Sequence, residues 1–148
     1  YLLKDAIGEI KAKFDYIFID CPPTLALLTV NALTAATDIY IPLQTEYLSM
    51  QGMSQMIKII EVVKKRLNEN VEVSGVIGTM YDGRKILDRK VLERVQEHFS
   101  ELLFDTIIRT NVSLAEAPSY HQDIFTYKSD STGAEDYLAL ADEIIKRS

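Results

Sequence analysis

The sequence predicts an α/β protein in which a mainly parallel sheet is flanked by helices on both faces. Short apolar runs that favour strands alternate along the chain with longer segments whose apolar residues recur every three or four positions. Such an alternation is typical of parallel strands joined by right-handed crossovers. The 148 residues are enough for one domain with its own core. We therefore expect residues 1–148 to form a single domain.

In the first half of the chain, each expected element follows from its own pattern. Residues 2–10 and 25–36 have apolar residues at helical spacing, and the second of these segments is rich in Leu and Ala. Residues 16–19 are apolar on both faces, as a strand inside a parallel sheet requires. The two prolines that follow stop this strand, because proline cannot donate to a ladder. Residues 38–43 form a second short run that favours a strand.

The second half continues the alternation. Residues 49–67 are apolar on one side and polar on the other, which predicts an amphipathic helix. Residues 71–80 and 104–109 predict two further strands, with a helix over residues 91–99 between them. Residues 134–146 predict a closing helix. Its expected inward-facing residues are Tyr137, Leu138, Ala141, Ile144 and Ile145.

Composition and charge exclude several classes of function. No apolar run approaches the roughly 20 residues of a membrane helix, and the start resembles no secretory signal. The only cysteine, Cys21, cannot form an internal disulfide, which agrees with a reducing compartment. A net charge of −6 argues against nucleic-acid binding through overall charge. We therefore expect a cytoplasmic protein that contacts DNA only through a local patch.

The apolar run DYIFID ends in Asp20, at the edge where open α/β sheets bind ligands. A strand that ends in an acidic residue is typical of a Walker B element, whose carboxylate helps to hold Mg²⁺ on nucleotide phosphates. Asp is also a common turn residue after a strand. The residues alone therefore leave both interpretations of Asp20 open.

A phosphate-binding loop of the P-loop type is not found among these residues. Its pattern is G-x-x-x-x-G-K followed by Ser or Thr. The nearest match, GTMYDGRK, has both glycines but places Arg84 and Lys85 where lysine and a hydroxyl residue are required. We therefore interpret Gly83 as a turn residue.

Four stretches cover nearly all of the chain: DYIFIDCPPTLALLTVNALTAATDIYIPLQTEY, GVIGTMYDGR, TIIRTNVSLAEAPSY and STGAEDYLALADEI. Together they resemble the ParA/Soj branch of the MinD-like P-loop ATPases, the bacterial chromosome- and plasmid-partitioning proteins. The resemblance implies a P-loop NTPase-like fold, incomplete at the N-terminus, with ATP and Mg²⁺ as cofactors. The chain would be the C-terminal half to two-thirds of such an ATPase, without its phosphate loop.

The resemblance also implies roles for the residues around the first expected strand. Asp20 would be the catalytic Walker B acid that holds Mg²⁺ through water. Cys21, Pro22 and Pro23 would form the switch II segment beside the γ-phosphate, where a stiff turn can transmit the loss of a phosphate. Cys21 has no evident basic partner to activate it, so we interpret it as a packed small residue rather than a nucleophile.

A second set of implied roles concerns the nucleotide base. Asn111 matches the family's asparagine that reads the adenine edge, for which an amide offers both a donor and an acceptor. Met80 and Arg109 would line the same pocket. The family usually has Pro-Arg before this asparagine, whereas this chain has Arg109 and Thr110. Without the resemblance, Asn111 would be read as a loop or cap residue.

Arg84 matches one of the arginines with which the family binds DNA without sequence preference. Three further basic residues follow it within six positions. Thr110 and Ser113 stand where arginines are common in the family, and each lost phosphate contact weakens binding and its salt dependence. The alternative for Arg84 is a solvated residue in a turn.

The main hypothesis is therefore a ParA-type partitioning ATPase that dimerises with ATP, binds DNA and hydrolyses ATP when a ParB-type partner stimulates it. It would act in the cytoplasm, on the nucleoid, with no membrane partner. We expect the 148 residues alone to hydrolyse ATP negligibly, because the phosphate-loop lysine is not among them. The alternative is a non-catalytic interaction module. A membrane-cycling MinD-type protein is disfavoured, because the closing helix is rich in acidic residues.

Overall fold

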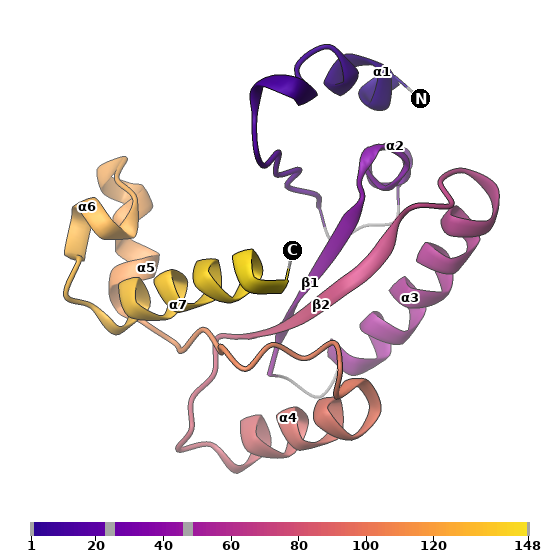
Figure 1. Ribbon diagram of the computed structural model, residues 1–148. Helices are drawn as coiled ribbons and strands as arrows, with labels where there is room; N and C mark the ends of the chain where they lie inside the picture. The colour runs from indigo at the N-terminus through magenta and orange to yellow at the C-terminus, as the bar shows by residue number, and fades with distance from the viewer. Residues whose placement is uncertain (1, 23–25, 46–48, 148) are drawn as a thin grey trace. The chain divides into compact units, whose positions relative to one another are not determined.

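The computed structural model describes residues 2–22, 26–45 and 49–147 (Figure 1). It confirms the predicted helices, although their ends differ by a few residues, and it confirms the strands expected over 38–43 and 71–80. In chain order the elements are α1 (Leu2–Gly8), η1 (Lys11–Lys13), α2 (Leu27–Ala35), β1 (Asp38–Gln44), α3 (Ser49–Arg66), β2 (Glu72–Thr79), α4 (Ile86–Phe99), α5 (Val112–Glu116), η2 (Ala117–Tyr120), α6 (Ile124–Lys128) and α7 (Thr132–Arg147).

The two strands form a parallel sheet flanked by helices, as the sequence predicts. A further segment runs parallel to β2 and is joined to it by isolated bridges from Val76 to Leu103 and from Tyr81 to Arg109. Figure 1 shows this segment as a trace beside β2, between α4 and α5. Consecutive parallel strands joined through helices are the arrangement of an α/β fold.

The chain divides into two compact units, and β1 and β2 run from one into the other. The first unit contains Tyr1–Tyr40 and Gln51–Ser74, and the second contains Ile41–Met50 and Gly75–Ser148. A single domain over residues 1–148 stays a prediction. Buried apolar side chains of the first unit include Leu33, Met53, Ile60, Val63 and Val71, and those of the second include Leu43, Val76, Val91, Val95, Phe104, Ile108 and Leu140.

The strand predicted over residues 104–109 is only partly confirmed. The segment keeps backbone hydrogen bonds to β2 near both of its ends but leaves the ladder between them. There, the N–H groups of Asp105 and Thr106 donate to the two carboxylate oxygens of Glu143 in α7, each at 2.9 Å. A side chain has taken the place of strand pairing here and satisfies the two backbone donors that the ladder leaves free.

Glu143→Gln should lower the free energy of unfolding by about 1–2 kcal/mol at neutral pH, because the amide nitrogen would face one of the two N–H donors. Burial raises the pKa of Glu143, but hydrogen bonds from Thr106 and Asp105 and the charge of Arg147 outweigh it, so the pKa lies below its ordinary 4.5. The carboxylate's contribution is therefore complete above pH 4.5 and is lost as the pH falls through the folded-state value.

Urea denaturation at neutral pH and at about pH 3 measures this effect. The difference between the wild type and the Glu143 variant should shrink at the lower pH. Glu101→Gln is the matched control, because Glu101 is exposed. Equal stability of Glu143→Gln and the wild type at neutral pH would contradict the role given to this carboxylate.

The strand predicted over residues 16–19 is wrong for this structure. These residues have no regular secondary structure, and none of the described segments pairs with them. Tyr16 and Phe18 are exposed, and their rings stack with centroids 6.3 Å apart. An apolar pattern makes a strand only where a neighbour accepts and donates its backbone hydrogen bonds, and the described ranges contain no such neighbour.

The inward face of α7 also differs from the prediction. Of the five residues expected to face inward, only Ile144 is half-buried. The side that packs inward carries Asp136, Leu140 and the partly buried Glu143. Asp136 and Glu143 can lie on this side because the carboxylate of each accepts hydrogen bonds from nearby N–H groups. These bonds offset the free-energy cost of burying a charge. The exposed four are Tyr137, Leu138, Ala141 and Ile145.

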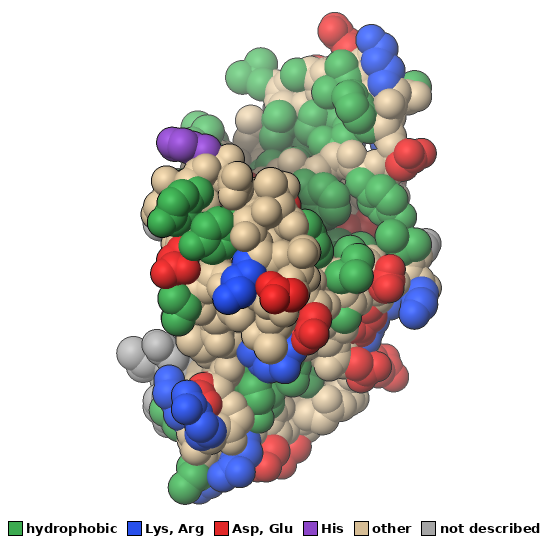
Figure 2. Space-filling view, turned by 90° about the vertical axis from the view of Figure 1, so that its left-hand side faces the viewer, with side chains coloured by type: hydrophobic (Ala, Val, Ile, Leu, Met, Phe, Trp, Pro, Cys, Tyr) green, Lys and Arg blue, Asp and Glu red, His purple; other side chains and the backbone are tan. Residues whose placement is uncertain are grey.

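The surface of the second unit carries apolar side chains among its charges. Figure 2 shows green patches on the face viewed from the side of α5 and α6, with acidic and basic side chains beside them. Val112, Tyr120 and Phe125 are exposed on these short helices. Among the described residues, no helix has the length and apolar character needed to cross a membrane.

Candidate functional site

Three segments of the second unit end at the same edge of the sheet. β1 leads into Thr45, β2 into Met80, and the segment beside β2 into Thr110. Open α/β sheets bind ligands at the carboxyl ends of their strands. The residues that line a cavity of about 150 Å³ at this edge are Gln44, Thr45, Met80, Lys85, Asp88 and Thr110.

Met80 marks the point where β2 turns away from the sheet. Its backbone is left-handed, with φ 54°, and its side chain is exposed. A residue other than Gly pays about 1–2 kcal/mol for this conformation, which the surroundings must offset. Thr110 Oγ1 donates to the Met80 carbonyl oxygen at 2.8 Å. The structure thus brings Met80 next to the start of the loop that carries Asn111.

The turn between β2 and α4 carries Arg84. The Nε and Nη2 groups of Arg84 donate to the two oxygens of Asp82, both at 2.9 Å, and the Arg84 side chain is 90% exposed. These hydrogen bonds are the largest cause that lowers the pKa of Asp82 to about 2. Asp88 in the first turn of α4 is buried and accepts a bond from Asp82 N at 2.8 Å. Gly83 lies in a turn, as predicted.

Arg109 is held by α7. Its backbone N donates to Asp136 Oδ2 at 2.9 Å, and its Nη2 donates to Asp136 Oδ1 at 2.6 Å. The side chain of Asp136 is 9% exposed, whereas that of Arg109 is 47% exposed. Hydrogen bonding to Asp136 is the largest cause that raises the pKa of Arg109, so the guanidinium stays charged. Sequence reasoning gave Asp136 no role, because nothing in its stretch STGAEDYLALADEI points to Arg109 as a partner.

Asn111 is the N-cap of α5. Its Oδ1 accepts from Leu114 N at 3.2 Å, which satisfies one of the free donors of the helix end. Its Nδ2 donates to Thr132 Oγ1, in the first turn of α7, at 2.7 Å. The cap interpretation of Asn111 is therefore confirmed, while its role toward adenine stays a prediction. The pattern T-x-x-E at Thr132 is a helix-start signal, which could have placed Thr132 at a helix end but not beside Asn111.

Asp20 and the residues after it belong to the first unit. Asp20, Cys21 and Pro22 are exposed, so the prediction that Cys21 is a packed residue is wrong, and Pro23 lies outside the described residues. Burial and the charge of Asp20 raise the pKa of Cys21, which favours the neutral thiol over a nucleophilic thiolate. Within the described ranges, no group of three or more His, Cys, Asp or Glu side chains forms a metal cage. Mg²⁺ often binds through only one or two carboxylates plus phosphate and water, so a lone Asp20 fits it.

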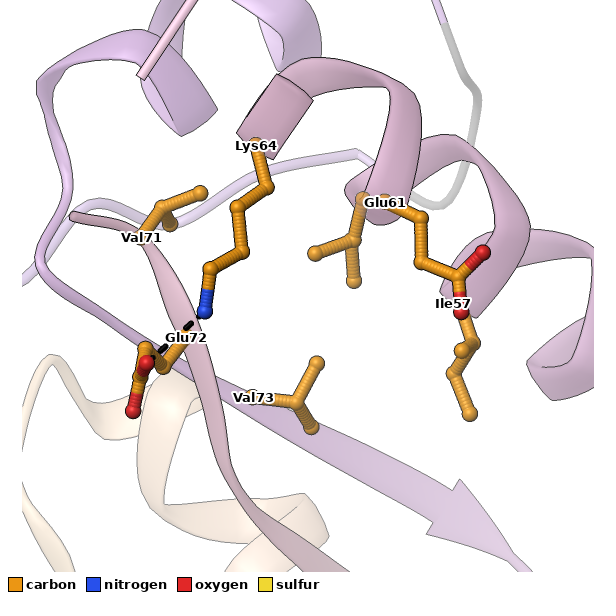
Figure 3. A pocket seen from close by; sticks show the side chains of 7 residues that line it. Ile57, Glu61, Lys64, Val71, Glu72 and Val73 are labelled. Atoms are coloured by element: carbon orange, nitrogen blue, oxygen red, sulfur yellow. Dashed lines mark hydrogen bonds and ion pairs between the residues drawn. The ribbon is translucent and has the colours of Figure 1, made fainter. Parts of the chain in front are cut away.

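A second cavity, of about 320 Å³, lies in the first unit between α3 and the start of β2 (Figure 3). Ile57 and Glu61 from α3 and Val73 from the strand line it. The ammonium group of Lys64 reaches across to Glu72 at 2.7 Å, and both side chains are well exposed. An exposed ion pair of this kind contributes little to stability. None of the predicted site residues lies here.

Comparisons with known sequences agree with the motifs. A family profile described as an AAA domain matches residues 1–73. The chain is 44% identical over 147 residues to the chromosome partitioning protein ParA of Myxococcus xanthus. The matched region covers 99% of this chain and 52% of that protein. It is 45% identical over 142 residues to the sporulation initiation inhibitor protein Soj of Bacillus subtilis, covering 96% of this chain and 56% of Soj. The chain thus spans about half the length of these curated relatives.

Solved structures give the same answer for the fold. Cobyrinic acid a,c-diamide synthase from Mycobacterium smegmatis, with bound ADP and magnesium, matches with a TM-score of 0.79 and 32% identity, covering 99% of this chain and 52% of that one. The cell division ATPase MinD of Pyrococcus furiosus matches with a TM-score of 0.79 and 26% identity, covering 99% of this chain and 58% of that one. This chain is therefore similar in sequence to the ParA and Soj proteins over about half of their length, and its fold is that of the P-loop NTPases.

Proposed function

We propose that this chain is the part of a DNA-partitioning ATPase that carries the Walker B acid, the base-reading loop and a DNA contact. The observation that carries the proposal is 44% identity over nearly the whole chain to a chromosome partitioning protein. The activity would be that of the ParA type: an ATP-bound homodimer binds DNA without sequence preference, and a ParB-type partner stimulates hydrolysis. The protein would work in the cytoplasm, on the nucleoid.

A similar solved structure holds ADP and magnesium, which supports a nucleotide with Mg²⁺ as the proposed cofactors. Asp20 would hold the ion through water, and the ion would neutralise charge on the phosphates. Cys21, Pro22 and Pro23 would respond to the γ-phosphate. Asn111 would contact the base, because its side chain keeps a donor and an acceptor beyond the bonds it already makes.

A chimera tests the proposed ATPase activity. The part of Bacillus subtilis Soj that lies outside the matched region is joined to this chain, and release of phosphate from ATP is measured with Mg²⁺. We expect turnover that requires Mg²⁺ and that falls by about 100-fold or more in Asp20→Asn, because the ion would lose its protein ligand.

The 148 residues alone should show negligible hydrolysis in the same assay. Asp15→Asn is the matched control, because Asp15 is a nearby exposed carboxylate without an assigned role. A folded chimera that lacks ATP hydrolysis, or one in which both aspartate variants behave alike, would contradict the proposal.

Arg84→Ala should weaken binding of the protein to random-sequence duplex DNA. It should also make the slope of log affinity against log salt concentration less steep, by about the amount that one phosphate contact per protomer contributes. Asp82→Asn should act in the opposite direction, because the Asp82 carboxylate occupies the Nε and Nη2 groups that would otherwise face a phosphate. Fluorescence anisotropy of a labelled duplex across a salt series measures both effects.

Arg94→Ala is the control for this experiment. Arg94 lies further along α4, and its substitution removes the same charge as Arg84→Ala. If Arg84→Ala and Arg94→Ala weaken binding equally, the effect is one of net charge, and the specific contact is ruled out.

A further inference from the structure

The N-terminal part of α7 contacts the loop 109–111 at two points, Thr132 and Asp136. Asp136 accepts three kinds of donor from Arg109, namely the backbone N, Nε and Nη2, at 2.6 to 3.0 Å. Thr132 Oγ1 accepts from Asn111 Nδ2 at 2.7 Å. The loop is therefore joined to α7 on both sides of Thr110. The resemblance implies no role in nucleotide binding for Thr132 or Asp136.

Two further contacts hold the start of α7 in place. Ser131 Oγ accepts from Ala134 N at 3.1 Å, which caps α7 at its start. A Cβ on Gly133 would lie 2.7 Å from Leu114 Cγ, so the turn is in close contact with α5. Thr132 stands between these two contacts, and its hydroxyl is held in place relative to Asn111.

These bonds fix which way the Asn111 amide points. A backbone N–H can only donate, so the atom that faces Leu114 N at 3.2 Å must be Oδ1. Nδ2 then faces Thr132. An amide has two N–H donors and two acceptor lone pairs. One N–H and one lone pair remain, in a fixed order.

A fixed donor and acceptor can distinguish purines. The N6 and N7 atoms of adenine present a donor beside an acceptor, which an amide can match with two bonds, whereas guanine presents two acceptors at the same edge. If the amide could rotate freely, it would lose part of this preference. The orientation of Asn111 therefore matters as much as its identity.

We propose that Thr132, supported by the Asp136–Arg109 pair, is a positioning residue that orients the Asn111 amide and thereby makes the site select adenine over guanine. This inference rests on the proposed nucleotide-binding function. Thr132 acts through Asn111 and does not itself read the base. Removing its hydroxyl should affect the adenine nucleotide more than the guanine nucleotide.

The experiment is a titration of the isotope-labelled protein with AMP and, separately, with GMP, followed by NMR at the Asn111 side-chain amide and the Thr110 backbone amide. Thr132→Val removes the hydroxyl and keeps the shape, and Thr132→Ser keeps the hydroxyl. Thr126→Val is the matched control, because the Thr126 hydroxyl also makes a side-chain hydrogen bond in the first turn of a helix, α6, where it donates to Asp123 Oδ2. Asp136→Asn, which keeps an acceptor for Arg109 N, is the second variant.

In Thr132→Val we expect the ratio of GMP to AMP dissociation constants to fall by about tenfold. Thr132→Ser should restore the ratio, Asp136→Asn should lower it less, and Thr126→Val should leave it unchanged. Even without nucleotide, the Asn111 NH₂ resonances should shift in Thr132→Val. An unchanged ratio, or equal weakening of AMP and GMP, would overturn the positioning role. A wild-type protein that binds neither nucleotide would instead overturn the proposed function and the inference with it.

Discussion

Gly75→Ala should destabilise the protein by about 3 kcal/mol, at the upper end of what one extra methyl group costs in a packed core. A Cβ at this position of β2 would lie 2.1 Å from Cε2 and 2.7 Å from Cδ2 of Phe104. Phe104 is 1% exposed. The guanidinium carbon of Arg147, on α7, lies 4.1 Å from the centroid of the Phe104 ring. The ring therefore has little room to move away. The midpoint of urea unfolding measures the effect.

Two further variants make this prediction specific. Gly52→Ala in α3 has no atom within 4 Å of its new Cβ, so it should leave stability unchanged or raise it by up to about 1 kcal/mol. Gly75→Ala combined with Phe104→Leu should cost less than the sum of the single changes, because the smaller side chain relieves the clash. Additive costs would show that the ring is not what Gly75 accommodates.

Arg109→Met should lower the free energy of unfolding by about 2–3 kcal/mol. The substitution leaves the Asp136 carboxylate, 9% exposed, without its cationic partner. Removing one member of a fully buried pair costs about 3–5 kcal/mol, and the value here is smaller because Arg109 is half exposed to water. Thermal unfolding with calorimetry gives the change directly.

The double variant Arg109→Met with Asp136→Asn should recover much of the loss. It removes the unpaired charge and still offers an oxygen to the backbone N–H of residue 109, which bonds Asp136 in the wild type. Arg84→Met is the control, since Arg84 pairs with Asp82 at the surface and should change stability little. A double variant as unstable as Arg109→Met alone would show that packing, and not charge, causes the loss.

The limits of sequence reasoning are clear in α7. Periodicity correctly located the helix, because one apolar stripe is a local property of the chain. Periodicity chose the wrong face, because the partners of Glu143 lie 37 and 38 residues away in the sequence and the partner of Asp136 lies 27 residues away. No pattern inside the helix reports a partner at that distance.

The strand prediction for residues 104–109 was only partly correct for the same reason. Its apolar, β-favouring composition predicts a strand, and its ends do bond to β2. The interruption depends on a carboxylate from α7 and is invisible in the segment itself. Gly75 is similar: in the sequence it is one glycine in a strand, and only Phe104 gives the reason for it.

The site could be predicted to the extent that motifs carried it. Met80, Arg109 and Asn111 lie in stretches that resemble the family, and the structure brings Met80 and the loop 109–111 to one sheet edge. Thr132 and Asp136 also lie in such a stretch, but their contacts with the loop come from another helix, which the stretch itself does not reveal. Residues that hold a functional group in place are set by geometry, which a linear pattern does not contain.

Besides its contacts with side chains, α7 bonds four backbone groups of the segment over residues 103–109. Arg147 donates to the Leu103 carbonyl oxygen, Glu143 accepts from two N–H groups, and Asp136 accepts from the Arg109 N–H. These are groups that an edge strand would otherwise offer to a strand of another molecule. The helix therefore protects this segment against intermolecular strand addition, because its side chains occupy backbone groups that a strand of another molecule would need.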